Sequence, residues 1–429
     1  MQTKAKEKIN IVTLGCAKNL VDSEVLMTQL KGNKKDVFHQ REDINPDIVI
    51  INTCGFIDKA KQESIDTILK HAKEKEDGII KKLYVTGCLS ERYKDDLKTD
   101  IPEVDGFYGT RDLPELLKNF EAKYRNELLG DRIITTDSHY AYLKISEGCD
   151  RPCSFCAIPL MRGRHISKPI DQIILEAKNL IRNGVREIML IAQDSTYYGI
   201  DIYKKRAMSE LLKKLSDVEG LDWIRIHYAY PAGFPMDIIE VMRERDNICN
   251  YLDIPLQHGS TKMLKVMKRG ITREKTDELI KNIRDINPEI ALRTTLIAGH
   301  PGETERDFQE MYDFVERSQF DRLGIFTYSH EEGTSAHKLE DDVPEQVKRS
   351  RSNKIMALQQ KISTEKNKSK VGKTVKVLID RVDANNYYGR TEQDSPEVDN
   401  EVIIPSKEMH LRVGDFYDVK ITDSKEYDL

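Results

Sequence analysis

Hydrophobic residues in the first 90 positions gather in three short apolar runs. The runs are KINIVTLG at 8–15, DIVIINT at 47–53 and KKLYVTG at 81–87. Residues 19–30 and 58–75, which follow the first two runs, have the apolar spacing of helices. Because short strands alternate with helices here, the pattern predicts a parallel, doubly wound sheet in the N-terminal part of the chain.

The same alternation of strand and helix continues between residue 136 and about residue 335. Residues 271–286 and 304–318 have helical spacing, and Lys168-Pro169 marks a further helix start. Six parallel strands with crossover helices predict an open, partial (β/α)6 barrel, whose chemistry lies at the carboxyl ends of its strands. The candidate strands are AYLKIS, REIMLIA, WIRIHY, YLDIPL, ALRTTLIAG and RLGIFTYS.

The pattern changes again in the last quarter of the chain. Residues 344–368 form a long, charged segment that is predicted to be a helix linking two domains. The short alternating runs TVKVLID, YYGRT, EVIIP and DFYDVKIT then predict a small antiparallel β-barrel of OB type. The predicted fold class is therefore α/β, with domains at 1–135, 136–368 and 369–429.

Composition places this 429-residue chain among globular proteins with a well-solvated surface, since 39% of its residues are hydrophobic and 33% are charged. No apolar stretch approaches the roughly 20 residues that a membrane-spanning helix needs. The first residues, MQTKAKEKINIVTLG, are basic but lack the apolar run of a signal peptide. These features predict a cytoplasmic protein without a membrane anchor. The net charge of −5 gives no overall footprint for nucleic-acid binding.

Six of the seven cysteines fall into two sets of three, which favours metal ligation over a disulfide framework. Cys149, Cys153 and Cys156 form a C-x3-C-x2-C motif in EGCDRPCSFC. Iron–sulfur clusters usually take four cysteines, so a cluster held by only three keeps one iron open to an exogenous ligand. The alternative is a zinc site that a distant residue such as His165 completes.

The other set consists of Cys16, Cys54 and Cys88, each of which directly follows one of the three N-terminal strands and adjoins a glycine. In an open α/β sheet the ligand crevice lies outside the carboxyl ends of the strands, so these thiols should converge on one edge. The alternative is three separate buried thiols. Their equivalent positions favour a second three-cysteine iron–sulfur site. We expect the two sites to face each other across a domain boundary near residue 135.

Polar residues also close several strands of the predicted barrel, at the mouth where the Cys149 loop lies. Gln193 or Gln257 could simply cap a strand end, and the glycines around His300 could form an ordinary strand-to-helix turn. Cys249 stands alone at the opposite end of the barrel, and we interpret it as a packing residue. The mouth residues are Gln193, Asp194, Gln257, His258, Arg293 and Gly299.

Together these motifs resemble the radical SAM methylthiotransferases over essentially the whole chain. The C-terminal part resembles their TRAM domain. TLGCAKNLVDSEVL, EGCDRPCSFCAIP, IAQDSTYYGID and SPEVD resemble the branch that modifies a ribosomal protein (RimO type). The tRNA branch (MiaB type) tends to have GQNV in place of AQDS, and Asn-Lys in place of Asp150-Arg151.

The resemblance implies two [4Fe-4S] clusters, one on each cysteine set, and S-adenosyl-L-methionine (SAM). The cluster on Cys149, Cys153 and Cys156 would cleave SAM to a 5′-deoxyadenosyl radical, which abstracts hydrogen from an unactivated carbon. The second cluster would supply the sulfur, and another SAM the methyl group; cofactors must carry such chemistry because the C–H bond has no useful acidity. The residues implied to contact the cofactor are Phe155, Gln193, Asp194, Gln257, Arg293 and Gly299.

The acceptor implied is the β-carbon of an aspartate in ribosomal protein S12, with a flavodoxin or ferredoxin as electron donor and the enzyme acting as a monomer. There are two alternatives. One is a tRNA methylthiotransferase of MiaB type, and the other is a radical SAM or iron–sulfur protein that does not methylthiolate. Residues 371–429 hold eight Lys and Arg against thirteen Asp and Glu, which disfavours tRNA. We predict that an acidic run there attracts the basic ribosomal protein, the alternative being a solvated loop. The run comprises Glu392, Asp394, Glu397, Asp399 and Glu401.

Overall fold

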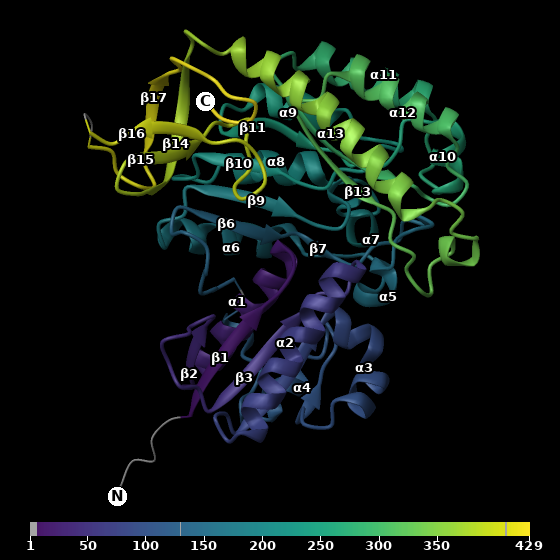
Figure 1. Cartoon of the computed structure of the whole chain (residues 1–429). Coiled ribbons are helices and arrows are strands. Elements are labelled where there is room, and N and C mark those ends of the chain that lie inside the picture. The colour runs from purple at the N-terminus through teal and green to yellow at the C-terminus, as the bar shows by residue number, and fades with distance from the viewer. Residues whose placement is uncertain (1–6, 129, 408–409) are drawn as a thin grey trace, which may run out of the picture.

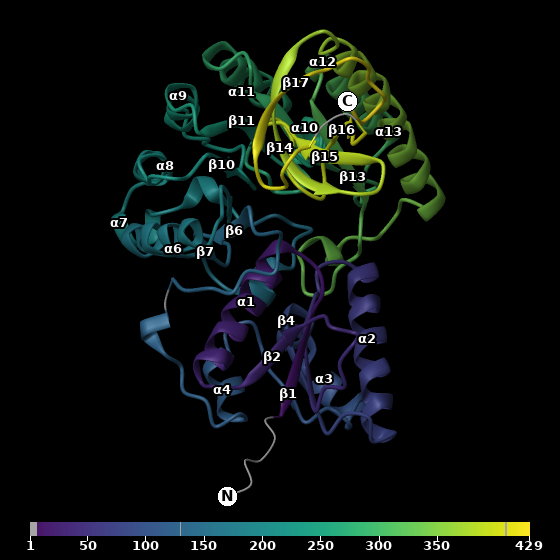
Figure 2. The ribbon, with the colours of Figure 1, turned by 90° about the vertical axis from the view of Figure 1, so that its left-hand side faces the viewer.

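The computed structural model describes residues 7–128, 130–407 and 410–429, and it contains three β-sheets of four or more strands (Figure 1). Residues 1–6, the beginning of the segment inspected for a signal peptide, lie outside the described residues. The N-terminal and C-terminal sheets flank a central six-stranded sheet on different sides (Figures 1 and 2). No helix within the described ranges is both long and apolar enough to cross a bilayer.

The N-terminal sheet has five parallel strands in the order β2-β1-β3-β4-β5. Apolar side chains cover both faces: Ile11 and Ile50 pack toward α1 on one face, and Ile51 and Val85 pack against Ile68 on the other. The prediction of a doubly wound parallel sheet is confirmed, and the edge strands β2 and β5 are additions to it. The elements are β1 (Lys8–Thr13), α1 (Ala17–Gly32), β2 (Asp36–His39), β3 (Ile48–Thr53), α2 (Asp58–Glu76), β4 (Lys82–Gly87), α3 (Cys88–Asp100), β5 (Gly106–Phe107) and α4 (Leu113–Lys118).

The central sheet contains all six predicted strands, which are parallel and follow each other in chain order. The edge strands β6 and β13 are not paired with each other among the described residues, so the barrel is open as predicted. The strands are β6 (Tyr140–Lys144), β9 (Glu187–Ile191), β10 (Trp223–Ile226), β11 (Ile248–Asp253), β12 (Ala291–Ala298) and β13 (Arg322–Thr327).

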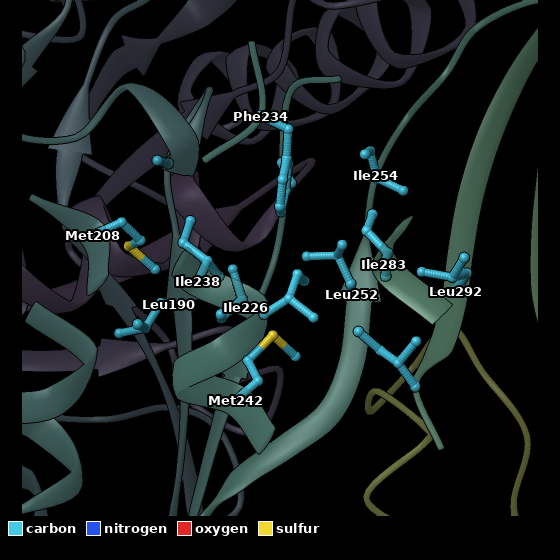
Figure 3. Close-up of a cluster of buried hydrophobic side chains, with 14 of the residues drawn as sticks. Leu190, Met208, Ile226, Phe234, Ile238, Met242, Leu252, Ile254, Ile283 and Leu292 are labelled. Atoms are coloured by element: carbon cyan, nitrogen blue, oxygen red, sulfur yellow. The ribbon is translucent and has the colours of Figure 1, made fainter. Parts of the chain in front are cut away.

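Helices cover the outer face of this sheet through one large apolar core. Figure 3 shows Leu190, Ile226 and Leu252 of the strands facing Ile238 and Met242 of a covering helix. Burial of such side chains contributes about 1.5–3 kcal/mol each, so this face is the main source of the barrel's stability. The helices are α5 (Ile158–Arg162), α6 (Ile170–Arg182), α7 (Ile200–Tyr203), α8 (Met208–Ser216), α9 (Asp237–Glu244), α10 (Thr261–Val266), α11 (Arg273–Ile286), α12 (Glu305–Ser318) and α13 (Glu345–Lys368). A short antiparallel pair, β7 (Ser146–Glu147) with β8 (Ile166–Ser167), brackets the Cys149 loop.

The C-terminal sheet is antiparallel and has the strand order β16-β15-β14-β17, around a small core that includes Val377, Ile379 and Ile404. The four predicted strands are all present. They are β14 (Thr374–Val382), β15 (Asn386–Arg390), β16 (Val402–Pro405) and β17 (Phe416–Lys420).

The C-terminal sheet packs against the end of the barrel at which its strands begin. Phe416 stacks edge-on against Trp223, the first residue of β10, with ring centroids 4.7 Å apart. Cys249 is buried in the same cluster, which confirms its packing role. Glu187, the first residue of β9, pairs with Arg390 at 2.8 Å. The C-terminal sheet therefore covers the end of the barrel that lies opposite the barrel mouth.

Three members of the acidic run contribute to this packing, so they are not the exposed charges that an attracting surface requires. For Glu397, which is exposed, and Glu401, which is half-buried, attraction of a ribosomal protein stays a prediction. Asp394 and the side chain of Asp399 are buried, and each accepts a hydrogen bond from an arginine of a barrel strand. Glu392 accepts from the backbone N–H of Asn250 at 3.0 Å, Glu397 accepts from two tyrosine hydroxyls of β6, and Glu401 pairs with Arg381. The physical reason is that arginines on the inner face of the barrel need buried counter-charges.

Candidate active site

The first three-cysteine set lies at the carboxyl edge of the N-terminal sheet, as predicted. Cys16 precedes α1 and follows β1, Cys54 follows β3, and Cys88 begins α3 directly after β4. Gly15 adopts a φ of +91°, and a Cβ atom there would lie 2.8 Å from the Sγ atom of Cys54. The strand ends and this close approach bring the first two thiols together.

Gly15→Ala is therefore expected to displace Cys54 and to lower the iron content of the loaded protein by about half, because one of two four-iron sites would be disturbed. Gly78→Ala is the matched control, since Gly78 also has positive φ but open space around it. Both changes strain the backbone by about 1 kcal/mol, and only the first should lose iron. Equal iron loss in both variants would contradict this explanation.

The second set lies in the loop between β7 and α5 at the mouth of the barrel. The N–H of Cys149 donates to the carbonyl of Gly163 at 3.0 Å, and the N–H of Cys156 donates to the carbonyl of Cys153 at 3.2 Å. Gly148 has a φ of +73°, and a Cβ atom at this position would meet a backbone oxygen at 2.0 Å. The motif is thus folded into a tight turn that only glycine permits at this point.

Both sets line one cavity of about 360 Å³, which we call the central cavity. This arrangement agrees with the expectation that the two sites face each other. The cavity lies between the carboxyl edge of the N-terminal sheet and the mouth of the barrel. Its lining comprises Gly15, Cys16, Lys18, Cys54, Phe56, Cys88, Cys149, Arg151, Cys153, Phe155, Cys156, Ile158, Met161, Arg162, Gln193, Tyr228, Ala229, Tyr230, Pro255, Gln257, Arg269, Thr295 and Phe326.

Three of the residues expected to contact a cofactor line the central cavity, namely Phe155, Gln193 and Gln257. Gln257 has a φ of +76°, a strained conformation for a residue with a side chain. Backbone hydrogen bonds fix it on both sides: its N–H donates to Thr295 and its carbonyl accepts from Ile297, each at 2.8 Å. Strain that is held this firmly is typical of functional sites.

The other three, Asp194, Arg293 and Gly299, do not line the cavity. Asp194 is buried and lies behind the lining. It caps the short 3-10 helix η2 (Ser195–Tyr197) by accepting from the N–H of Thr196, and it accepts from the Nε atom of Arg151 at 2.7 Å. This hydrogen bond holds the side chain of Arg151, which does line the cavity.

Arg293 and Gly299 have partners away from the cavity. Arg293 donates to Asp253 at 3.0 Å and to Asp399 of the C-terminal sheet at 3.3 Å. Arg293 therefore helps to hold the C-terminal sheet against the barrel. Gly299 packs under α13, and a Cβ atom there would lie 2.2 Å from the Cγ atom of Lys348.

The histidine of the alternative zinc site is engaged elsewhere. The Nε2 atom of His165 forms a hydrogen bond with the Oγ atom of Ser167 at 2.9 Å, and His165 is not part of the cavity lining. The zinc alternative therefore lacks its candidate fourth ligand.

Four cationic residues of the cavity were missed by the sequence interpretation. Lys18 and Arg151 each follow a cysteine by two positions, a proximity that could have indicated them, whereas the other two carry no local signal. Within the described ranges no Asp or Glu lines the cavity, so its charged side chains are all positive. They are Lys18, Arg151, Arg162 and Arg269.

Two of these arginines join the site to its surroundings. Arg162 is buried and donates to Asp22 of α1 at 2.9 Å and to Glu147 of the barrel at 3.0 Å, which ties the N-terminal part to the barrel. Arg269 donates from Nη1 to the Sγ atom of Cys153 at 3.1 Å. Hydrogen bonds of this kind orient metal ligands and tune them.

Burial and charge act in opposite directions on the thiols. Burial raises the pKa of Cys88 and Cys156 to about 12 and that of Cys149 to about 11. Desolvation also acts on Cys16, but the nearby charges of Lys18 and Arg162, together with backbone hydrogen bonds from Asn19 and Lys18, lower the pKa of this thiol. The raised values favour neutral thiols until a metal displaces their protons.

Three family models match successive parts of the chain. The uncharacterized protein family UPF0004 matches residues 8–109, the radical SAM superfamily matches 143–315, and the TRAM domain matches 371–429.

Curated relatives match from end to end. The ribosomal protein uS12 methylthiotransferase RimO of Cytophaga hutchinsonii is 60% identical, over 99% of this chain and 97% of its own length. Those of Christiangramia forsetii and Bacteroides thetaiotaomicron are 58% and 53% identical, over 100% and 99% of this chain and 95% and 98% of their own lengths. The chain belongs to the RimO family of radical SAM methylthiotransferases.

Solved structures extend the likeness of the fold beyond the RimO family. The radical SAM methyltransferase TsrM from Kitasatospora setae, solved with cobalamin and a [4Fe-4S] cluster, has a TM-score of 0.54 at 14% identity, over 75% of each chain. Its complex with tryptophan and a SAM analogue has a TM-score of 0.56 at 14% identity, over 75% of this chain and 73% of that one.

The two thiol sets border a space in which clusters could lie. Among the residues that the structure describes, no three metal-ligating side chains close around one point at the distances of a single ion. The thiols instead border a larger space. A cubane cluster binds each cysteine through a different iron, so it needs thiols around a volume. The residues present therefore fit iron–sulfur clusters, which RimO-family enzymes use together with SAM.

Proposed function

We propose that this protein adds a methylthio group to the β-carbon of an aspartate in ribosomal protein uS12. The observation that carries the proposal is the single cavity lined by all six motif cysteines. Sulfur insertion at an unactivated carbon requires two cofactor sites close enough to act on one substrate atom. The identity to RimO relatives over the whole chain supports uS12 as the substrate.

We assign the ligands by set. Cys149, Cys153 and Cys156 hold the cluster that binds SAM, and the other three motif cysteines hold the second cluster. When bound, the two clusters and SAM supply hydrogen abstraction from carbon and the sulfur that replaces the hydrogen.

The chain's own residues position these groups and shield them from water. Arg269 orients the thiolate of Cys153 through its hydrogen bond. Phe155, Gln193 and Gln257 contact SAM, and their place in the lining of the central cavity supports this assignment. Of the remaining predicted contacts, Asp194 acts through Arg151, whereas Arg293 and Gly299 maintain the architecture around the site.

We also propose that the chain divides into three domains, with boundaries at residues 135 and 368. The three family models support this division because they match separate segments. The enzyme works in the cytoplasm as a monomer and receives electrons from a flavodoxin or ferredoxin.

The central test uses protein loaded anaerobically with iron and sulfide, then incubated with SAM, a reductant and either uS12 or tRNA. Mass spectrometry of both products is expected to find the methylthio group on one aspartate of uS12. The variant that lacks the three barrel cysteines is the negative control. Methylthiolated tRNA with unmodified uS12 would reject the proposal in favour of the tRNA branch.

A further inference from the structure

Lys18 differs from Arg151 and Arg162 of the central cavity because, among the described residues, no carboxylate pairs with it. The side chain is only 7% exposed, and its ammonium group lies 3.7 Å from the ring centroid of Tyr228. The three arginines of the cavity each donate to an acceptor. Across the described part of the chain, the Nζ atom of Lys18 has a cation–π contact with Tyr228 but no hydrogen bond to a protein acceptor and no ion pair with a carboxylate. The rest of the side chain is enclosed while the residue lines the cavity, so the ammonium group is available to an anionic ligand there.

The place of Lys18 in its helix strengthens this argument. It lies in the first turn of α1, which contains no acidic residue. The helix dipole places a partial positive charge at the N-terminus, and this charge repels a cation. Lys18 therefore does not stabilise α1. A residue that breaks a local rule in this way is expected to serve a functional site.

Tyr228 holds the ammonium group on the cavity side. Its φ of +61° is rare for a bulky residue, and two hydrogen bonds maintain it. Its N–H donates to Asp253 at 3.2 Å, and its carbonyl accepts from Ser195 at 3.0 Å. The strained backbone thus fixes the ring against Lys18, and the cation–π contact leaves the ammonium hydrogens free to bind an acceptor.

We propose that Lys18 binds the side-chain carboxylate of the target aspartate. This inference rests on the proposed function, and it makes Lys18 a residue that determines substrate specificity. A carboxylate would supply the missing anion in a cavity whose charged side chains are all positive. The β-carbon is bonded directly to the carboxyl carbon, so anchoring the carboxylate also fixes the C–H bond that reacts.

Two other anionic partners are conceivable, and both can be measured. The SAM carboxylate is expected beside the barrel cysteines, whereas Lys18 follows Cys16 at the N-terminal set. The second cluster itself could attract the ammonium group. Either alternative predicts that a Lys18 variant loses SAM affinity or iron, and not substrate selectivity.

The experiment compares two uS12 peptides that differ only in having aspartate or asparagine at the target position. Their Kd values are measured by fluorescence anisotropy with full-length, cluster-loaded protein. The wild type should bind the aspartate peptide about 10- to 100-fold more tightly, the range for a charge-assisted hydrogen bond. Lys18→Met should bind both peptides equally, and Lys18→Arg should retain part of the preference. Lys31→Met, at an exposed lysine of the same helix, should behave as wild type.

An absence of preference in the wild type would overturn the inference, and so would a preserved preference in Lys18→Met. Loss of iron or of SAM affinity in Lys18→Met, with the preference intact, would assign the residue to a cofactor instead. The comparison of peptides on wild-type protein remains informative if the variant folds poorly. Failure of the proposed function is distinguishable, because the wild type would then leave uS12 unmodified.

Discussion

Replacing Cys149, Cys153 and Cys156 together by alanine is expected to abolish SAM cleavage and to remove about half of the bound iron. The wild type should hold about eight irons, since each three-cysteine set fits one four-iron cluster. The reason for complete loss of cleavage is that these three thiols form the set in the loop at the barrel mouth, which the proposal assigns to the SAM-binding cluster. Iron analysis and quantification of 5′-deoxyadenosine after anaerobic loading test both parts.

Replacing Cys16, Cys54 and Cys88 should give a different result. About half of the iron should again be lost, but SAM cleavage should remain measurable without methylthio transfer. Cys249→Ala is the matched control, because this thiol is buried away from the cavity and should leave the iron content unchanged. Zinc in place of iron after anaerobic preparation would show that the ligand assignment is wrong.

Asp394→Asn is expected to lower the free energy of unfolding by about 3–5 kcal/mol, the cost of leaving a buried charge uncompensated. Asp394 is buried and accepts from the Nε atom of Arg322 at 2.9 Å. Arg322 would remain in the barrel without its counter-charge. Denaturant unfolding that is monitored separately for the barrel and the C-terminal sheet should show the loss at their contact.

The effect of Asp394→Asn should depend on pH in a defined direction. Burial opposes ionisation of Asp394, but the charges of Arg322 and Lys370 lower its pKa. A lowered pKa in the folded state contributes stability above the unfolded value of about 3.9, and the contribution is lost as pH falls through the folded value. The difference between wild type and variant should therefore persist at neutral pH and shrink only in strong acid. Asp418→Asn, an exposed change in the same sheet, should have little effect at any pH.

The main elements of the fold were predictable because local patterns specify them. The six barrel strands and the N-terminal strands β1, β3 and β4 are apolar runs between amphipathic helices. The edge strands β2 and β5 were missed, since four- and two-residue strands carry too little periodicity to be recognised.

The site was predictable only in part. The six cysteines could be grouped because each follows a strand or belongs to a compact motif, and parallel strands end at a common edge. Arg162 and Arg269 could not be assigned to the cavity from sequence. They reach it from α5 and from the segment after α10, and nothing in the local pattern marks an arginine that points inward.

The acidic run shows why charge along the chain was misleading. Glu392, Asp394 and Asp399 are close in sequence and looked like one exposed, negative surface. In the fold they accept hydrogen bonds from barrel residues that lie more than 70 positions away, and the carboxylates of Asp394 and Asp399 become buried against arginines. Electrostatic roles depend on distance and burial, and neither is encoded locally.

The sequence alone determined the order of the elements, the fold class and the two sets of thiols, because each depends on residues near one another in the chain. Tertiary structure alone decided that both sets share one cavity, that the C-terminal sheet closes the far end of the barrel, and that Lys18 lies against Tyr228 in the cavity lining. These three features depend on contacts between distant segments. Such contacts form only when the whole chain packs, so no local pattern can specify them.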